Sequence, residues 1–434
     1  MDNNEQPEKG NGKGLRRVGA VLMALALVAV GFVAGWFGRY GAIDPQMRRL
    51  MWAVRTTEKN FYTDWDVYEN LFAALTPDAY SCYYTAEQYD EILRESEGEN
   101  VGAGFSISPF EADESVRVFS VVGNSPAERA GLRKGMYIYE CGTSKDKLEE
   151  VDSSDSIISS VRASKTIYLK CGYAPETAEV FEVTVGEYAA SYCMYRDAKA
   201  TYAFRGDKAE NLTPTDVTEE YGVLEGADDK TAYIRIDEFN GYVAQEFKAC
   251  LTLMKGRGKS NLVLDLRSNG GGYLDKLVAV ASHLMKNASG KPVTVATAKY
   301  RGGHVQRYAT STSDYYDYFL SDSRILFLAD EYTASASECL LGAMIDYGTI
   351  SYEDVIVRTE TGRSYGKGIM QSHFSDAYGN VMKLTVATIH WPVSDRCIHG
   401  TGVGISDGAK SVDAPFVWSA EDKTLAFALA ELSA

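Results

Sequence analysis

Histidine is scarce in this chain, although it is the side chain that most often serves as a general base in enzymes. The 434 residues contain five histidines, which are His283, His304, His373, His390 and His399. Neither Cys-x-x-Cys nor His-Glu-x-x-His spacing occurs, so the sequence gives no support for a metal site. His373 and His390 stay open as neighbours of a site, but lone histidines usually have structural or surface roles.

Clusters of basic residues and a cysteine framework are also missing. The net charge is −16, with 44 basic and 60 acidic residues, which argues against nucleic acid as a partner. Seven cysteines are an odd number without framework spacing, so most are expected to be buried or free. Cys141 and Cys171 could pair if the exterior is oxidising. The 45% hydrophobic content is enough for the cores of two or three domains.

One long apolar run is present near the N-terminus. Residues 18–37 contain no charge and are long enough to span a bilayer. Lys13, Arg16 and Arg17 precede the run and only Arg39 follows closely, which favours a cytoplasmic tail at 1–17 and an outer location for the rest. A cleaved signal peptide is the alternative, but no clear small-x-small cleavage site lies near the end of the run. We therefore expect an uncleaved single-pass anchor, with the rest of the chain on the periplasmic side of the cell envelope.

The segment around Ser335 has the pattern of a strand, a tight turn and a helix. An apolar run at 325–328 precedes the sequence Thr-Ala-Ser-Ala-Ser-Glu at 333–338, and apolar residues at helical spacing follow it. A serine at the start of a helix is exposed, and the amide of Ala336 has no partner within the helix. These features predict that Ser335 is a nucleophile.

Lys367 lies between two glycines, in the sequence Gly-Arg-Ser-Tyr-Gly-Lys-Gly at 362–368. Glycines let the backbone approach other parts of the chain closely, as a buried catalytic amine requires. A lysine with an ordinary pKa of about 10.4 is almost fully charged at neutral pH. Burial away from carboxylates favours the neutral form, and a neutral Lys367 can then take the proton from Ser335.

A glycine-rich turn separates a predicted buried strand at 261–266 from an amphipathic helix that begins near Leu274. Three consecutive glycines at 270–272 expose backbone N–H groups, the donors from which an oxyanion hole is built. A phosphate-binding loop is the alternative, but no Lys-Ser/Thr pair follows the glycines as a P-loop requires. We expect the amides of Gly270 and Gly271, together with Ala336, to bind the oxyanion.

The order Asp-Leu-Arg-x-Asn-Gly-Gly-Gly, then Ser-Ala-Ser-Glu, then Gly-Lys-Gly-x-x-Gln resembles the C-terminal processing peptidases, also called tail-specific proteases. The resemblance implies that Ser335 is the nucleophile and Lys367 the general base. It also implies that Gln371 orients the lysine without charging it, and Glu338 matches a supporting acid of the family. Tricorn-like relatives place a histidine before the glycine turn, where this chain has none.

Ser337 is a rival nucleophile because it lies only two residues after Ser335. Side chains two positions apart do not share a face of a helix, so only one of the two serines can meet Lys367. The alignment with the family favours Ser335.

Residues 101–107 and 123–135 resemble a PDZ domain. In such domains a glycine loop presents amides to the terminal carboxylate of a peptide, which adds a strand to the sheet edge. The resemblance implies that Gly102, Ala103 and Gly104 hold the carboxylate and that Phe105 lines the side-chain pocket. A small β-rich domain without a ligand is the alternative.

The resemblance implies a complete domain organisation. Together with the transmembrane helix expected at 18–37 from the apolar run, it gives an N-terminal helical region at 41–98, a small β-rich PDZ domain at 99–187 and a catalytic domain at 188–434. The catalytic domain is expected to be an α/β core with a ClpP/crotonase-like sheet and helices. Relatives use the helical region to pack on the core or to dimerise, so a homodimer or an adaptor protein is an expected partner. No cofactor is indicated.

The sequence therefore predicts a membrane-anchored serine-type endopeptidase with a Ser-Lys dyad. It would cleave proteins near their C-termini, with the tails recognised by the PDZ domain. One alternative is a catalytically silent or adaptor-gated scaffold that binds tails, and a second is an amidase that acts on a non-protein acyl group. The presence of Ser335, Lys367 and Gln371 argues against the first, and the tail-binding module argues against the second.

Overall fold

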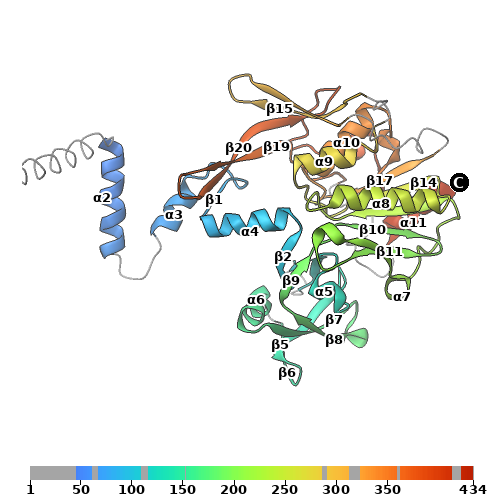
Figure 1. The fold of residues 1–434 in the computed structure, drawn as a ribbon, viewed down its shortest axis with the longest axis horizontal. Helices are drawn as coiled ribbons and strands as arrows, with labels where there is room; N and C mark the ends of the chain where they lie inside the picture. Colours follow the sequence, from blue (N-terminus) through green and yellow to red (C-terminus); the bar gives the residue numbers. More distant parts are fainter. Residues whose placement is uncertain are drawn as a thin grey trace, which may run out of the picture. The chain divides into compact units, whose positions relative to one another are not determined.

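The computed structural model describes residues 45–60, 67–108, 116–151, 153–285, 291–311, 323–358, 362–412 and 422–433. The chain separates into two compact units, Met1–Pro77 and Asp78–Ala434. The described part of the first unit contains helices α2 (Pro45–Asn60) and α3 (Val67–Ala74) (Figure 1). The anchor predicted at 18–37 lies outside the described residues. Of the helices that are described, none is long and apolar enough to cross a membrane.

The second unit begins with a strand that the sequence did not predict. β1 (Cys82–Tyr84) pairs antiparallel with β20 (Val381–His390), which places Cys82 opposite Lys383. Helix α4 (Ala86–Ser96) follows, and Thr85 and Gln88 form a capping box at its start. The prediction of a helical region throughout 41–98 is therefore wrong at 82–84. A three-residue strand has too little local pattern to be recognised, and its partner lies far away in the sequence.

A small β-rich module follows, close to the predicted range of 99–187. Its elements are β2 (Glu99–Gly102), β3 (Phe105–Ile107), β4 (Val118–Val121), α5 (Pro126–Arg129), β5 (Tyr137–Ser144), β6 (Lys147–Glu150), α6 (Ser154–Ala163), β7 (Thr166–Gly172), β8 (Glu179–Thr184) and β9 (Gly186–Ala189). Val118, Leu132 and Ile167 belong to a core of its own. β2 pairs with β9, so the first and last strands of the module meet. Cys141 and Cys171 are both buried and free, on the adjacent strands β5 and β7.

The predicted catalytic domain is built on an eight-stranded sheet with the order β12-β11-β10-β13-β14-β17-β18-β21. The strands are β10 (Cys193–Asp197), β11 (Thr201–Arg205), β12 (Thr213–Asp216), β13 (Thr231–Ile236), β14 (Asn261–Asp265), β17 (Ile325–Asp330), β18 (Val355–Arg358) and β21 (Lys410–Val412). From β13 to β21 neighbouring strands are parallel, and β14 and β17 are buried along their whole length. Burial on both faces explains their continuous apolar sequences.

Helices cover both faces of this sheet. The larger core cluster contains residues of α8 (Val243–Gly256), α9 (Leu274–Ala281) and α10 (Ala336–Asp346). A second cluster joins α11 (Lys423–Ser433) to the opposite face through Leu425 and Leu429. The predicted α/β core is confirmed by this arrangement (Figure 1).

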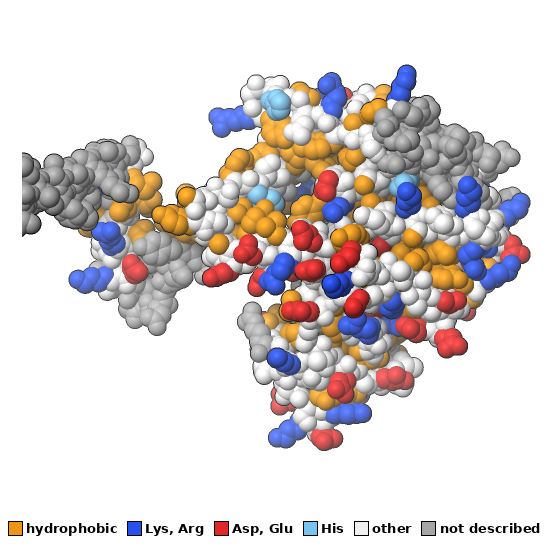
Figure 2. All heavy atoms as spheres, in the orientation of Figure 1, with side chains coloured by type: hydrophobic (Ala, Val, Ile, Leu, Met, Phe, Trp, Pro, Cys, Tyr) orange, Lys and Arg blue, Asp and Glu red, His pale blue; other side chains and the backbone are white. Residues whose placement is uncertain are grey.

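A second sheet lies beside the start of α10 and carries the lysine segment. It has the order β1-β20-β15-β16. β19 (Ile369–Ser375) is the fifth strand of this sheet and pairs antiparallel with β20. β15 (Thr294–Tyr300) and β16 (Val305–Ala309) complete it. On the face shown in Figure 2, hydrophobic side chains gather around β15 and α9. The hairpin of β19 and β20 begins directly after Lys367, so this sheet determines where the lysine lies.

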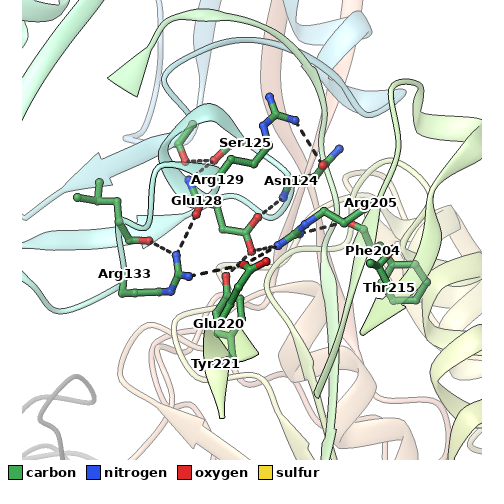
Figure 3. A network of polar contacts seen from close by, with 12 residues as sticks. Asn124, Ser125, Glu128, Arg129, Arg133, Phe204, Arg205, Thr215, Glu220 and Tyr221 are labelled. Carbon is green, nitrogen blue, oxygen red and sulfur yellow. Dashed lines mark hydrogen bonds and ion pairs between the residues drawn. The ribbon is translucent and has the colours of Figure 1, made fainter. Parts of the chain in front are cut away.

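Glu128 joins the β-rich module to the catalytic domain through a polar network (Figure 3). The carboxylate is buried and accepts hydrogen bonds from the amide of Asn124, the guanidinium of Arg205 and the hydroxyl of Tyr221. The distance to Arg205 is 2.9 Å. Arg133 donates to the backbone carbonyl of Glu128 at 2.9 Å. A buried carboxylate needs such partners, so this network fixes α5 against β11 and α7 (Thr218–Tyr221).

Glu246 is a second buried carboxyl group, placed by α8 beside the start of β10. Its Oε2 accepts hydrogen bonds from the amides of Tyr192 and Cys193, each at 2.8 Å, and its Oε1 has no hydrogen-bond partner. Burial raises the pKa of Glu246 to about 8, against the opposing effect of the two amides. Because the folded-state pKa lies above the unfolded value of 4.5, this group lowers the free energy of unfolding as the pH rises from 4.5 through 8.

We expect Glu246→Gln to have nearly the unfolding free energy of the wild type at pH 5 and to be more stable by up to a few kcal/mol at pH 8. Glutamine keeps an acceptor oxygen for the two amides and cannot ionise, so the pH-dependent loss disappears. Urea denaturation at both pH values measures the difference. Glu150→Gln is the matched control, because Glu150 is exposed. The same stability difference at pH 5 and pH 8 would contradict the prediction.

Candidate active site

Ser335 lies at the sharp turn between β17 and α10, as the sequence predicts. Its backbone has φ 58° and ψ −114°, a positive φ that is uncommon for a residue with a side chain and that often marks functional sites. The amide of Ser335 donates to Oε2 of Glu338 at 2.9 Å. The side chain lines a cavity of about 720 Å³, which Lys367 also lines.

Ser337 is excluded as the nucleophile by its surroundings. Its side chain is fully buried, and its hydroxyl donates to the backbone carbonyl of Asn269 at 3.1 Å. Among the described residues that line the cavity, Ser335 is present and Ser337 is not. The geometry therefore agrees with the choice of Ser335.

The glycine turn packs directly against Ser335. A Cβ atom at Gly271 would lie 2.7 Å from Cβ of Ser335 and 2.9 Å from the amide nitrogen of Ala336, and the φ of Gly271 is 108°. Only glycine can occupy this position without displacing the nucleophile. The loop itself is held by Asn269, whose side-chain amide donates to the carbonyl of Ile236 at 2.9 Å.

One of the predicted oxyanion donors is already used. The amide of Gly271 donates to Oδ1 of Asn269 at 2.9 Å, so the prediction for Gly271 as a free donor is corrected. The neighbouring Gly272 lines the cavity. A Cβ atom at Gly270 would meet no atom within 4 Å apart from its chain neighbours, so Gly270 lies beside open space. The prediction fails at Gly271 because the side-chain oxygen of Asn269 already accepts the hydrogen bond of this amide.

Glu338 connects the backbone of the serine to the backbone of the lysine. This fully buried carboxylate accepts from the amides of Ser335 and Lys367 on Oε2, both at 2.9 Å. On Oε1 it accepts from the amide of Gly366 at 2.7 Å and from the hydroxyl of Ser364 at 2.6 Å. Burial raises the pKa of Glu338, although these four hydrogen bonds act in the opposite direction. One side chain therefore fixes both segments at the edge of the cavity.

The amine of Lys367 lies where its charged form is disfavoured. Burial is the largest effect and lowers the pKa of Lys367, and the charge of Lys383 adds to it. The carboxylates of Asp78 and Glu338 oppose this shift without reversing it. The Nζ atom lies 4.9 Å from the centroid of the Tyr80 ring. A lysine with a lowered pKa is what a serine nucleophile needs as its base.

Gln371 lies on β19 and lines the same cavity. Its side-chain nitrogen donates to the hydroxyl of Thr385 on β20 at 3.0 Å. The structure therefore brings Gln371 close to the site but shows its amide bonded to the neighbouring strand. The orientation of Lys367 by Gln371 stays a prediction.

Comparison with known proteins bears on this arrangement. Residues 230–406, which include the glycine turn, Ser335 and Lys367, match the sequence profile of peptidase family S41. This match supports a serine-type peptidase.

Two similar proteins carry names that support a serine-type peptidase. The carboxyl-terminal-processing protease of Picosynechococcus sp. is 25% identical to this chain over 328 residues, which cover 74% of this chain and 67% of that protein. A probable CtpA-like serine protease of Staphylococcus epidermidis is 26% identical over 336 residues, or 75% of this chain. The chain spans 56% of the length of that second relative.

A solved structure shares the fold. A putative S41 protease from Bacteroides fragilis superimposes with a TM-score of 0.52 at 15% identity, and the match covers 88% of this chain and 97% of that one. The likeness confirms the α/β core of the S41 proteases in this chain.

His373 and His390 are the two histidines that the sequence left open as neighbours of the site. His373 lines the cavity and contacts the ring of Tyr89 in a tilted arrangement, with 5.2 Å between the ring centroids. Burial, followed by the charge of Lys383, lowers the pKa of His373. His390 is hydrogen-bonded to the backbone carbonyl of Asp395 at 2.8 Å. In the part of the chain that the structure describes, no hydrogen bond joins either histidine to Ser335.

Sequence reasoning missed the side chains that β1, its flanking residues and β20 bring to the site. Tyr84 and Lys383 both line the cavity, and the Lys383 amine lies 5.7 Å from the centroid of the Tyr84 ring. Tyr80 covers the amine of Lys367. The tyrosines at 80, 83 and 84 are visible in the sequence, but their position depends on the pairing of β1 with β20, which local patterns do not show.

The residues predicted to bind a peptide carboxylate lie together at one end of the β-rich module. Gly102 ends β2, Phe105 begins β3, and Ala103 and Gly104 connect the two strands. The carbonyl of Ala103 accepts from the amide of Ala127 on α5 at 2.9 Å. Phe105 packs against the core of the module. Carboxylate binding by these residues stays a prediction.

Proposed function

We propose that this protein is an S41-type endopeptidase with a Ser-Lys dyad that cleaves protein substrates near their C-termini. The observation that carries the proposal is the bridging carboxylate of Glu338, which holds the backbones of Ser335 and Lys367 at one cavity. The lowered pKa of Lys367 supports its role as the base.

The chemistry follows from these positions. The neutral amine of Lys367 takes the proton of the Ser335 hydroxyl while the serine oxygen bonds to the carbonyl carbon of the substrate. The carbonyl oxygen becomes an oxyanion, for which the amides of Ala336 and Gly272 are the proposed donors. The Lys367 ammonium then gives its proton to the leaving amine as the peptide bond breaks. Water releases the acyl group from Ser335 by the reverse proton transfers.

The proposal includes tail recognition by a PDZ domain formed by the β-rich module. β3 is paired on one side only among the described strands, with β4, so its other edge is open to an added strand. Membrane anchoring through 18–37, with the catalytic domain outside, is also part of the proposal, and the charge asymmetry around that run supports it.

The test is cleavage of an unfolded protein with an apolar C-terminal tail by the full chain. We expect Ser335→Ala to abolish cleavage and Ser337→Ala, the matched control two residues away, to retain it, because the Ser337 hydroxyl faces a buried carbonyl. Circular dichroism would verify that both variants fold. Equal cleavage by the wild type and Ser335→Ala would overturn the dyad, and no cleavage by the wild type would favour a tail-binding scaffold.

A further inference from the structure

A tyrosine that lies far from the catalytic motifs in the sequence covers the amine of Lys367. The Nζ atom of Lys367 lies 4.9 Å from the centroid of the Tyr80 ring. The hydroxyl of Tyr80 is hydrogen-bonded to the hydroxyl of Tyr365 at 3.0 Å. Tyr365 precedes Lys367 by two residues, and its amide donates to the carbonyl of Thr333 at 3.0 Å. Tyr80 is therefore connected both to the base and to the loop that leads to Ser335.

The backbone around Tyr80 is fixed by a turn. Oδ1 of Asp78 accepts from the amide of Tyr80 at 3.0 Å and from the amide of Ser81 at 2.8 Å. An aspartate whose side chain accepts hydrogen bonds from the backbone amides two and three positions later forms an Asx-turn, a recurrent local structure. Oδ1 of Asp78 is thus used within its own turn, and the carboxylate also interacts with the side chain of Thr385 on β20.

Ser81 connects this turn to the sheet that carries the lysine segment. Ser81 is buried, and its hydroxyl oxygen accepts from the amide of Thr385 on β20 at 3.2 Å. The hydroxyl of Thr385 in turn accepts from the side chain of Gln371 at 3.0 Å. Directly after Ser81, β1 pairs with β20. Tyr80 is consequently held on the same strand ladder that positions the lysine segment.

The groups that act on Lys367 come from three other elements. Lys383 on β20 is a like charge, whereas Asp78 before β1 and Glu338 on α10 are carboxylates. Asp78 is bonded to its own turn and to the side chain of Thr385, and Glu338 is bonded to backbone amides. The aromatic ring of Tyr80 is a neutral surface against the amine.

We propose that Tyr80 is a positioning residue for Lys367, whose ring shields the amine from water and holds it at the cavity beside Ser335. Its hydroxyl, through Tyr365, keeps the ring in place. The proposal rests on the proposed function, in which Lys367 is the general base.

The sign of the expected effect follows from two opposing influences. The face of an aromatic ring attracts an ammonium and favours the charged lysine. Exclusion of water disfavours the charge, and burial is the largest influence on Lys367. Removal of the ring therefore admits water and raises the pKa of Lys367 toward its ordinary value.

We expect Tyr80→Ala to lower kcat by about 10- to 100-fold, the size of effect that follows from misplacing a catalytic group, with KM changed by less than about threefold. The acidic limb of the pH profile of kcat/KM should move to higher pH. Tyr80→Phe keeps the ring, so its acidic limb should stay at the wild-type position. Tyr365→Phe removes the same hydrogen bond by deleting the partner hydroxyl. Its acidic limb should therefore lie at the same pH as that of Tyr80→Phe.

Tyr378→Ala is the control for loss of a tyrosine, because Tyr378 is 86% exposed. Tyr80→Gln, a polar side chain that cannot shield the amine, replaces Tyr80→Ala if the alanine variant does not fold. Wild-type kcat and an unmoved acidic limb in the folded variant would overturn the proposal, as would equal losses in Tyr80→Phe and Tyr80→Ala. Either result leaves the dyad standing if Ser335→Ala and Lys367→Ala are both inactive, so failure of this inference is distinguishable from failure of the proposed function.

Discussion

Replacing Lys367 with alanine is expected to abolish turnover while the protein stays folded. The substitution removes the only proposed base, and loss of one member of a nucleophile–base unit typically lowers kcat by roughly 10⁴- to 10⁶-fold. The fold should persist because the structural contact of this residue is its backbone amide, which donates to Glu338 and is present in any variant. Single-turnover kinetics with an unfolded protein substrate, together with a thermal melt, measure both effects.

Two further variants make this prediction specific to proton transfer. Lys367→Arg keeps a cation near the Tyr80 ring, but arginine cannot be neutral in a protein, so it should be as inactive as Lys367→Ala. Lys383→Met removes the other lysine that lines the cavity and should retain most of its activity at alkaline pH. Substantial turnover in folded Lys367→Ala would exclude a Ser-Lys dyad.

The second large effect is expected for Glu338→Ala, which should lose both stability and activity. Its removal leaves three amides without their acceptor, the buried amide of Gly366 and the partly buried amides of Ser335 and Lys367. Each such donor costs about 1 to 3 kcal/mol, so we expect the free energy of unfolding to fall by about 3 kcal/mol or more. The activity of the folded fraction should fall as well, because the serine and lysine segments are no longer held together.

Urea denaturation and the kcat of the folded fraction separate these two losses. Glu246→Ala is the matched control, since Glu246 is also a buried carboxyl group that accepts from two backbone amides, but it does not line the described cavity. It should lower stability and leave the kcat of the folded fraction unchanged. If Glu338→Ala behaves in the same way, its role is limited to folding.

The sequence was sufficient to predict those parts of the site that are built from adjacent residues. The strand–turn–helix around Ser335 follows from local apolar periodicity, and the structure confirms it. The short-range motifs also indicated that Ser335 and Lys367 belong to one site, and both line the same cavity. The buried parallel strands could be recognised because burial on both faces leaves a continuous apolar run.

The sequence was insufficient where a side chain takes a partner from a distant segment. The use of the Gly271 amide by Asn269 depends on a side-chain orientation that no pattern encodes. The bond from Gln371 to Thr385 depends on the register of β19 and β20. Tyr80 and β1 reach the site through pairing with β20, roughly 300 positions later in the chain, which only the folded structure shows.

The shared carboxylate of Glu338 also bears on how the length of this chain can vary. The segments that carry Ser335 and Lys367 are both held at Glu338, so the distance between the two backbones does not depend on the chain that joins them. Residues can be added to or removed from the turns between α10 and β19 at a small entropic cost, without moving the nucleophile relative to its base. The spacing between the two catalytic motifs is therefore a poor guide to whether a related sequence retains a working dyad, and an acidic residue three positions after the serine is a better one.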